Sequence, residues 1–328
     1  MADIARLAGV SLASVSRALS GSPLVPETQR RRILAIAEEY GYAVNQAARN
    51  LRRQSTGTIG LVMPMAHEAG QPVTDPFLLE LTGHLSEEVF RRGYDLLSAR
   101  HHAPPPGWLR NLVLSQRFDA MLVLGQSDQH LVLNQLSAGY APMVVWGDRL
   151  PDQNYCSVGV DNRFGGRMAT EHLLSRGRRN ILFLGPVQAP EAASRLDGYT
   201  DALSDAGLPI RPELIARAGF TPDAAEIALR QALAAGIAFD AIFAASDVIA
   251  LTAIRILSEA GLSVPGDVSI CGFDDIAMSQ HLTPALTTVR QDLAQGAQLM
   301  VDLLFRRLGG ESLPAVIMPP ELIVRGTS

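Results

Sequence analysis

Residues 7–21 of the chain read LAGVSLASVSRALSG, and their spacing sets the fold that we expect for the N-terminal segment. Apolar residues before Gly9 fall at helical spacing, and Ser11 can cap a second helix that carries Val15 and Ala18 on one face. Gly9 permits a tight turn between them, because glycine adopts unusual backbone angles without strain. The stretch therefore predicts two short helices that cross at a glycine, as in a helix-turn-helix unit.

The second helix of such a unit enters the DNA major groove and contacts base edges with its first turns. Arg17 is the only long hydrogen-bond donor among the residues in those turns. Ser11 and Ser14 lie near the helix N-terminus, where hydroxyls and free backbone N–H groups can hold a phosphate. The DNA-binding residues predicted from this stretch are Ser11, Leu12, Ala13, Ser14, Ser16 and Arg17.

The charge distribution supports a nucleic-acid partner for this segment. Residues 1–55 contain eight arginines against four carboxylates, a net charge of +4, whereas the whole chain carries −5. A small basic head on an acidic body suggests that the head alone contacts a polyanion. A third helix is predicted from Pro26 to about Tyr40, and an ordinary helical hairpin with a solvated charged face is the plainer alternative. The apolar residues at core spacing in this helix are Ile33, Leu34, Ile36 and Ala37.

Several protein classes are disfavoured by the sequence. No apolar run reaches the roughly 18 residues of a membrane span, and the N-terminus does not read as a secretion signal, so we expect a cytoplasmic protein. Cys156 and Cys271 are far apart and predict neither a disulfide nor a zinc site. The pair His101-His102 precedes a proline run without a metal-ligand partner, and no catalytic motif is visible. We predict no metal, no cofactor and no enzymatic activity.

Beyond residue 57 the sequence predicts an α/β fold. Apolar runs such as TIGLVMP (58–64), FDAMLVLG (118–125) and APMVVWG (141–147) alternate with amphipathic segments, and a second series follows with NILFLGP, FDAIFAA and DVSICGF. Continuous apolar strands separated by helices indicate parallel sheets covered on both faces. Two series predict two open sheets, with a ligand cleft beyond the carboxyl ends of their strands.

The segment YAVNQAARNLRRQSTGTIG (42–60) connects the two parts, and it can form a short helix over Asn45 to Leu51 followed by a polar linker. This segment resembles the hinge of the LacI/GalR family of bacterial transcription regulators. Further stretches occur in the order typical of that family, and the resemblance runs nearly end to end. They are DIARLAGVSLASVSRALSG, VGVDNRFGGRMATEHLLSRGRRNILFLGP, RLDGYTDAL, ASDVIALTAIRILSEAGLSVPGDVSICGFDD and LTPALTTVRQD.

The resemblance implies a domain organisation. An all-α helix-turn-helix head (1–44) is joined by a hinge helix and linker (45–57) to a two-lobed core like that of periplasmic binding proteins (58–328). The N-subdomain is expected at about 58–158 and 288–316, and the C-subdomain at about 159–286 and 317–328. The chain is expected to cross between them near 158, 283–287 and 316–321.

In that family, paired hinge helices lie in the minor groove and a leucine wedges between base pairs. The matching residue here is Leu51, with Asn45, Ala48 and Arg49 beside it; a linker leucine packed on the core is the alternative. Wedging costs a few kcal/mol of unstacking, offset by contacts to bent DNA. Many members carry proline where this chain has Val44, so we expect a less rigid hinge. The family usually has several residues before the position of Asp3, which implies either a start further upstream or a weaker DNA contact.

The resemblance also implies an effector site. Arg195 in RLDGY and Asp274 in GFDD match family residues that bind effector hydroxyls or carboxylates, and Arg149 is a weaker candidate. Ser246 stands where many sugar-responsive members have asparagine. The implied effector-binding residues are Phe77, Asp148, Arg195, Phe220, Ser246, Asp247 and Asp274. Paired carboxylate and guanidinium groups with an aromatic face favour a ligand rich in hydroxyls, although a nucleobase would use the same groups.

We therefore expect a repressor of carbohydrate-utilisation genes whose affinity for its operator is switched by a small sugar-like effector. A purine- or nucleoside-responsive regulator of the same fold is the alternative. A two-lobed solute-binding protein would need a secretion signal and no DNA-binding head, and an enzyme would need a catalytic constellation. The expected partners are double-stranded palindromic DNA, the effector and a second copy of the chain. The final residues, ELIVRGTS, contain no apolar heptads, so a dimer is expected rather than a tetramer.

Overall fold

The structure of the chain is a computed structural model that describes residues 1–19, 22–41, 55–64, 72–101, 105, 107–126 and 128–328. The predicted hinge helix lies outside the described residues, and so do Asn45, Ala48, Arg49 and Leu51. The chain divides into two compact units, Met1–Thr56 and Gly57–Ser328. Each is described by itself.

The first unit contains the three predicted helices, α1 (Ala2–Ala8), α2 (Leu12–Leu19) and α3 (Glu27–Glu39). Gly9 ends α1 with a positive φ of 65°, the left-handed conformation that glycine tolerates best. The hydroxyl oxygen of Ser11 accepts a hydrogen bond of 3.1 Å from the backbone N–H of Ser14, as an N-cap does. The helix-turn-helix prediction is thus confirmed in its local geometry.

A small apolar core holds these helices together. Leu34, predicted to lie in it, is 42 % exposed, because it is one residue removed from the buried stripe of α3. Ile36 is only partly buried at the edge of the core. The buried residues are Ile4, Ala5, Ala8, Val15, Ala18, Val25, Ile33 and Ala37.

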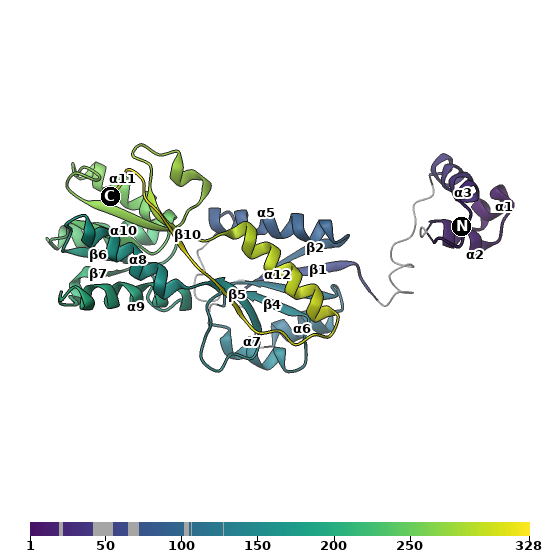
Figure 1. Cartoon of the computed structure of the whole chain (residues 1–328), viewed down its shortest axis with the longest axis horizontal. Coiled ribbons are helices and arrows are strands. Elements are labelled where there is room, and N and C mark those ends of the chain that lie inside the picture. Colours follow the sequence, from purple (N-terminus) through teal and green to yellow (C-terminus); the bar gives the residue numbers. More distant parts are fainter. Residues whose placement is uncertain (20–21, 42–54, 65–71, 102–104, 106, 127) are drawn as a thin grey trace. The chain divides into compact units, whose positions relative to one another are not determined.

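The first lobe of the second unit is a six-stranded parallel sheet in the order β11-β5-β4-β3-β1-β2. Successive residues of β1 point to opposite faces: Leu61 packs into one apolar cluster and Val62 into another. Helices α5 and α12 cover one face of this sheet, and α6 and α7 cover the other (Figure 1). Its elements are β1 (Thr58–Pro64), α5 (Pro76–Arg91), β2 (Asp95–His101), α6 (Trp108–Leu114), β3 (Ala120–Leu124), α7 (His130–Ser137), β4 (Met143–Trp146), β5 (Cys156–Val160), α12 (Leu293–Leu308) and β11 (Val316–Met318).

The second lobe is another six-stranded sheet, in the order β12-β10-β9-β8-β6-β7. All neighbours pair in parallel except the edge strand β12, which is antiparallel to β10. Helices α8 and α9 lie on one face, and α10 and α11 lie on the other (Figure 1). Its elements are α8 (Asn162–Ser175), β6 (Ile181–Gly185), α9 (Pro190–Asp205), the 3-10 turn η1 (Pro212–Leu214), β7 (Ile215–Arg217), α10 (Pro222–Ala234), β8 (Ala241–Ala244), α11 (Asp247–Glu259), β9 (Ser269–Asp274), the 3-10 turn η2 (Ala277–Gln280), β10 (Thr287–Arg290) and β12 (Glu321–Ile323).

The chain passes between the lobes at three points. The first follows β5 and the third separates β11 from β12, close to the predicted positions. The second prediction, at 283–287, is wrong by a few residues, since β10 pairs with β9 and keeps the chain in the second lobe through Arg290. Thr287 and Thr288 are fully buried in the second lobe, and the Thr288 hydroxyl donates a 2.5 Å hydrogen bond to Asp247, which belongs to that lobe. Among the described residues, no helix combines the length and apolar character needed to cross a bilayer.

Candidate functional site

The outward face of α2 carries the residues predicted to contact DNA. Leu12 is 54 % exposed, and Ala13 and Arg17 are exposed as well. At 100° per residue these side chains share one face of the helix with the half-buried Ser16, while Val15 and Ala18 point into the core. The Ser11 and Ser14 hydroxyls lie 3.0 Å apart at the N-terminus of the helix. The face therefore combines a long cationic donor with small residues that permit a close approach to base edges.

In the second unit, the structure holds Arg195 in a fixed orientation. This residue of α9 is 5 % exposed, and its Nε donates a 2.9 Å hydrogen bond to the side-chain oxygen of Asn162 at the start of α8. Its Nη1 donates a 2.5 Å bond to the carbonyl of Ala245, just after β8. The guanidinium carbon lies 3.7 Å from the centre of the Phe273 ring. Contacts from three elements thus place one buried cation at the carboxyl end of the second sheet.

Asp274, at the end of β9, is the partner of this cation. Its Oδ1 lies 3.7 Å from Nη1 of Arg195 and accepts a 2.7 Å hydrogen bond from the side-chain amide of Gln291. Burial raises the pKa of Asp274 well above its ordinary value, and the Arg195 guanidinium opposes that rise. Within the described part of the chain, no hydrogen bond to Nη2 of Arg195 or Oδ2 of Asp274 is present. A guanidinium N–H and a carboxylate oxygen are therefore available to a ligand.

Two contacts join the lobes beside this pair. The Asp148 carboxylate, which follows β4, lies near the side chain of Ser194 on α9 and interacts with it. The carboxylate of Glu191, also on α9, interacts with the backbone N–H of Gln126 in the first lobe. Burial raises the pKa of both carboxyl groups, and the positive charge of Arg195 opposes the rise in each. The first turns of α9 therefore contact the first lobe and hold Arg195 at the same time.

Gln126 itself is fully buried and fixed by neighbours in the first lobe. Its side-chain amide donates to the Asp148 carbonyl at 2.6 Å and to the Tyr155 hydroxyl at 2.9 Å, while its oxygen accepts from the Asp148 N–H at 3.0 Å. A Cβ at Gly147 would lie 2.7 Å from this side chain, so a larger residue there would displace the Gln126 amide from its hydrogen bonds. These contacts hold the loop after β3 and the loop after β4 together at the carboxyl end of the first sheet.

The structure gives Ser246 and Asp247 roles within the second lobe. The Ser246 side chain caps α11. Both oxygens of the fully buried Asp247 carboxylate accept hydrogen bonds, from the backbone N–H of Ile276 and from the hydroxyls of Ser279 and Thr288. Burial nevertheless raises the pKa of Asp247 to about 7. Direct ligand contact by these two residues remains a prediction from the resemblance, and their observed partners are all internal.

The aromatic candidates lie in different places. Phe77, in the first turn of α5, is half-buried, with its ring 6.2 Å from that of Trp146 at the end of β4. It therefore lies at the carboxyl end of the first sheet, where a ligand face is expected. Phe220 follows β7 and packs, half-buried, against the core of the second lobe. Its part in the ligand site remains a prediction.

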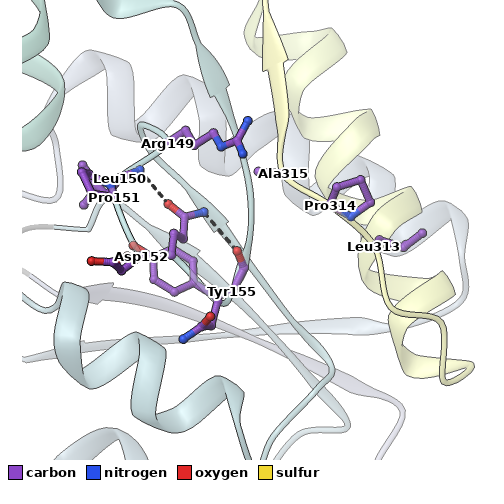
Figure 2. A pocket seen from close by; sticks show the side chains of 10 residues that line it. Arg149, Leu150, Pro151, Asp152, Tyr155, Leu313, Pro314 and Ala315 are labelled. Carbon is purple, nitrogen blue, oxygen red and sulfur yellow. Dashed lines mark hydrogen bonds between the residues drawn. The ribbon is translucent and has the colours of Figure 1, made fainter.

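A pocket of about 620 Å³ opens on the first lobe beside the loop 149–155 (Figure 2). The weaker candidate Arg149 lines this pocket, and its side chain extends towards Ala315. The pocket includes neither Arg195 nor Asp274. Arg149 therefore belongs to a different surface from the buried ion pair, although its neighbour Asp148 is beside that pair.

Sequence reasoning missed five residues that shape the site. Asn162 lies within VGVDNRFGG, Trp146 within APMVVWG and Gln291 within LTPALTTVRQD, so each of these three had a motif that could have drawn attention to it. The other two depend on contacts between distant segments that no local pattern reveals. The five are Gln126, Trp146, Asn162, Glu191 and Gln291.

Comparisons with known proteins agree with both units. A family model described as bacterial regulatory proteins, lacI family, matches residues 1–45, and one described as a periplasmic binding protein-like domain matches residues 170–328. The HTH-type transcriptional regulator CelR of Thermobifida fusca is 32 % identical over 98 % of this chain and 96 % of its own length. The HTH-type transcriptional regulator AscG of Escherichia coli is 32 % identical over 99 % of this chain and 97 % of its own.

Solved structures give the same result. A CelR–cellobiose complex superposes with a TM-score of 0.75 at 30 % identity, over 99 % of this chain and 98 % of that one. The relatives named here are transcription regulators, and the similarity extends over the head and both lobes. The exposed face of α2 and the paired lobes are accordingly those of a DNA-binding, ligand-responsive regulator. The chain belongs to the LacI family of bacterial transcription regulators.

Proposed function

We propose that this regulator represses carbohydrate-utilisation genes and that a small sugar-like effector in the interlobe cleft switches its operator affinity. The observation that carries the proposal is the buried pair Arg195 and Asp274, which leaves Nη2 and Oδ2 unoccupied among the described residues. A donor and an acceptor side by side match the alternating hydroxyls of a sugar ring. The relative CelR has been solved with cellobiose, which makes a sugar the first class to test.

On the DNA side, we propose that the chain acts in the cytoplasm as a homodimer on a palindromic operator. The exposed face of α2, with Arg17 as its long donor, enters the major groove of each half-site. Asn45, Ala48, Arg49 and Leu51 would complete the contact in the minor groove. The corresponding domains are the head (1–44), the hinge (45–57) and the core (58–328).

The switch follows from the contacts between the lobes. Asp148 contacts Ser194, and Gln126 contacts Glu191, only when the carboxyl ends of the two sheets are close together. A ligand bound to Arg195 and Asp274 changes the relative free energies of open and closed arrangements by its differential affinity for them. That change would determine whether the two hinges of a dimer can pair on DNA.

The first experiment is thermal unfolding of the purified protein against neutral mono- and disaccharides, sugar phosphates and purines. A ligand that binds the folded state raises its stability by about 2.7 kcal/mol at one hundred times its Kd. Arg195→Ala should abolish the stabilisation and the change in operator affinity while operator binding itself persists. The matched control is Arg163→Ala, which removes an arginine paired on the surface with Asp201.

The outcomes separate the alternatives. Unchanged stabilisation of Arg195→Ala by the same ligand would place the site elsewhere. A purine as the only stabilising ligand would favour the second candidate, a nucleobase effector, for which the half-buried Phe77 ring beside Trp146 offers a stacking surface.

A further inference from the structure

The charged groups that act most strongly on Arg195 are all carboxylates. Besides Asp274, the carboxylates of Glu191, Asp148 and Asp247 all act electrostatically on this one guanidinium. Asp75, the N-cap residue of α5 in the first lobe, in turn acts on Asp274. The buried Arg195 guanidinium therefore has carboxylates from both lobes around it.

Arg195 is also poorly placed to bind an anionic group. A guanidinium binds phosphate or carboxylate best through two parallel N–H bonds. Here Nε already donates to Asn162, and Nη1 donates to the Ala245 carbonyl and faces Asp274 at 3.7 Å. Only Nη2 is left for a ligand among the described contacts, which suits a hydroxyl oxygen better than an anion.

After Asp274, Glu191 is the carboxylate that acts most strongly on Arg195. It precedes Arg195 by four residues on α9, so the two side chains lie on the same face of the helix, one turn apart. It is half-buried, and burial raises its pKa. Asp247, by contrast, is fully buried with its oxygens taken by internal donors. Above their raised pKa values, Glu191 of the second lobe and Asp148 of the first both present a negative charge to a ligand beside Arg195.

We infer that the cleft takes neutral or amine-bearing sugars and rejects sugar phosphates and uronic acids, with Glu191 as the residue that sets this selectivity. This inference rests on the proposed effector function of the cleft. Like charges in a poorly solvated site repel strongly, because little water screens them. An ammonium group would instead find carboxylate partners on both lobes.

The test compares matched ligands on one protein. Each neutral sugar of the panel is titrated with its amino, uronic acid and 6-phosphate derivatives, and affinities are measured by calorimetry on the full chain. The wild type should bind the uronic acid and the phosphate at least about tenfold more weakly than the neutral parent. In Glu191→Gln the ratio of anionic to neutral affinity should rise about tenfold, since one of the repelling charges is gone. The ratio is used because any weakening of the Gln126 contact alters closure for all ligands alike.

The matched control is Asp205→Asn, at the other end of α9 and about 20 Å from Glu191 at 1.5 Å per residue. This carboxylate is exposed and paired with Arg167, so the ratio should stay at its wild-type value. Thermal unfolding confirms that each variant is folded. A sugar phosphate or uronic acid that binds the wild type as tightly as its neutral parent would overturn the inference while leaving the effector function intact. An unchanged ratio in Glu191→Gln would remove Glu191 from it, and the absence of binding by every class would overturn the proposed function itself.

Discussion

Gly166→Ala tests how the fold positions the arginine of the cleft. Helices α8 and α9 pack closely, and a Cβ at Gly166 would lie 2.1 Å from the backbone carbonyl oxygen of Arg195. Ordinary van der Waals contact begins at 3.4 Å. Helix α9 must therefore shift by more than about 1 Å to admit one methyl group. The obstacle is backbone, so a side-chain rotation cannot relieve it.

The magnitude follows from two opposing effects. Overpacking costs about 1 to 3 kcal/mol, and a rigid backbone obstacle places this site at the upper end. Alanine in a helix interior recovers about 1 kcal/mol relative to glycine. We expect the free energy of unfolding to fall by about 2 kcal/mol. The displaced Arg195 should also lose part of its hydrogen bonding to Ala245, which would reduce stabilisation by the effector.

Urea unfolding followed by circular dichroism measures the effect in both lobes, whereas the two tryptophans, Trp108 and Trp146, report only on the first. The control is Ser204→Ala, an exposed position of α9 whose hydroxyl only donates to the Thr200 carbonyl. It should change stability by less than about 0.5 kcal/mol. If Gly166→Ala is as stable as the control and binds effector normally, the close approach of α8 and α9 does not position Arg195.

Two further predictions concern the head and a buried acid. Arg17→Ala should cost about 1 to 3 kcal/mol on the specific operator if the arginine contacts a base edge; an equal loss on random DNA would reduce it to a phosphate contact. Asp247 has its pKa raised from 3.8 to about 7 in the folded state, so the folded form holds its proton at a pH where the unfolded chain has lost it. Its contribution to stability is therefore complete below about pH 4 and is lost as the pH rises to about 7. The destabilisation of Asp247→Asn relative to wild type should shrink over that range in urea titrations, and a pH-independent difference would contradict this.

Much of the fold could be predicted because most of its buried strands are continuous apolar runs in the sequence. The six apolar runs of the sequence correspond to β1, β3, β4, β6, β8 and β9, whose buried stretches suit a covered parallel sheet. The strands β7, β11 and β12 have only three residues each and are mostly half-exposed, so they produce no apolar run. β10 reads TTVR, and its buried Thr288 is hydrogen-bonded to Asp247, which is 41 residues away in sequence.

The site was predictable only in part. Arg195 and Asp274 stood in recognisable motifs, and the structure brings them together at 3.7 Å. Their environment could not be read in the same way, because Gln126 and Glu191 come from different lobes and meet only after both sheets have formed. Asp247 was predicted as a ligand contact because it is a polar residue at a strand end. Its observed hydrogen bonds are all to residues of its own lobe.

The first turns of α9 have a consequence for how such a regulator can diversify. Glu191 contacts the first lobe, and Arg195, one turn later, faces the proposed ligand. A mutation that retargets the sensor to a new metabolite at this turn would also change the energy of lobe closure. Ligand specificity and the free energy of lobe closure therefore depend on the same turn of α9. A variant with a new specificity would need a compensating change elsewhere before its dose-response curve returned to the original midpoint.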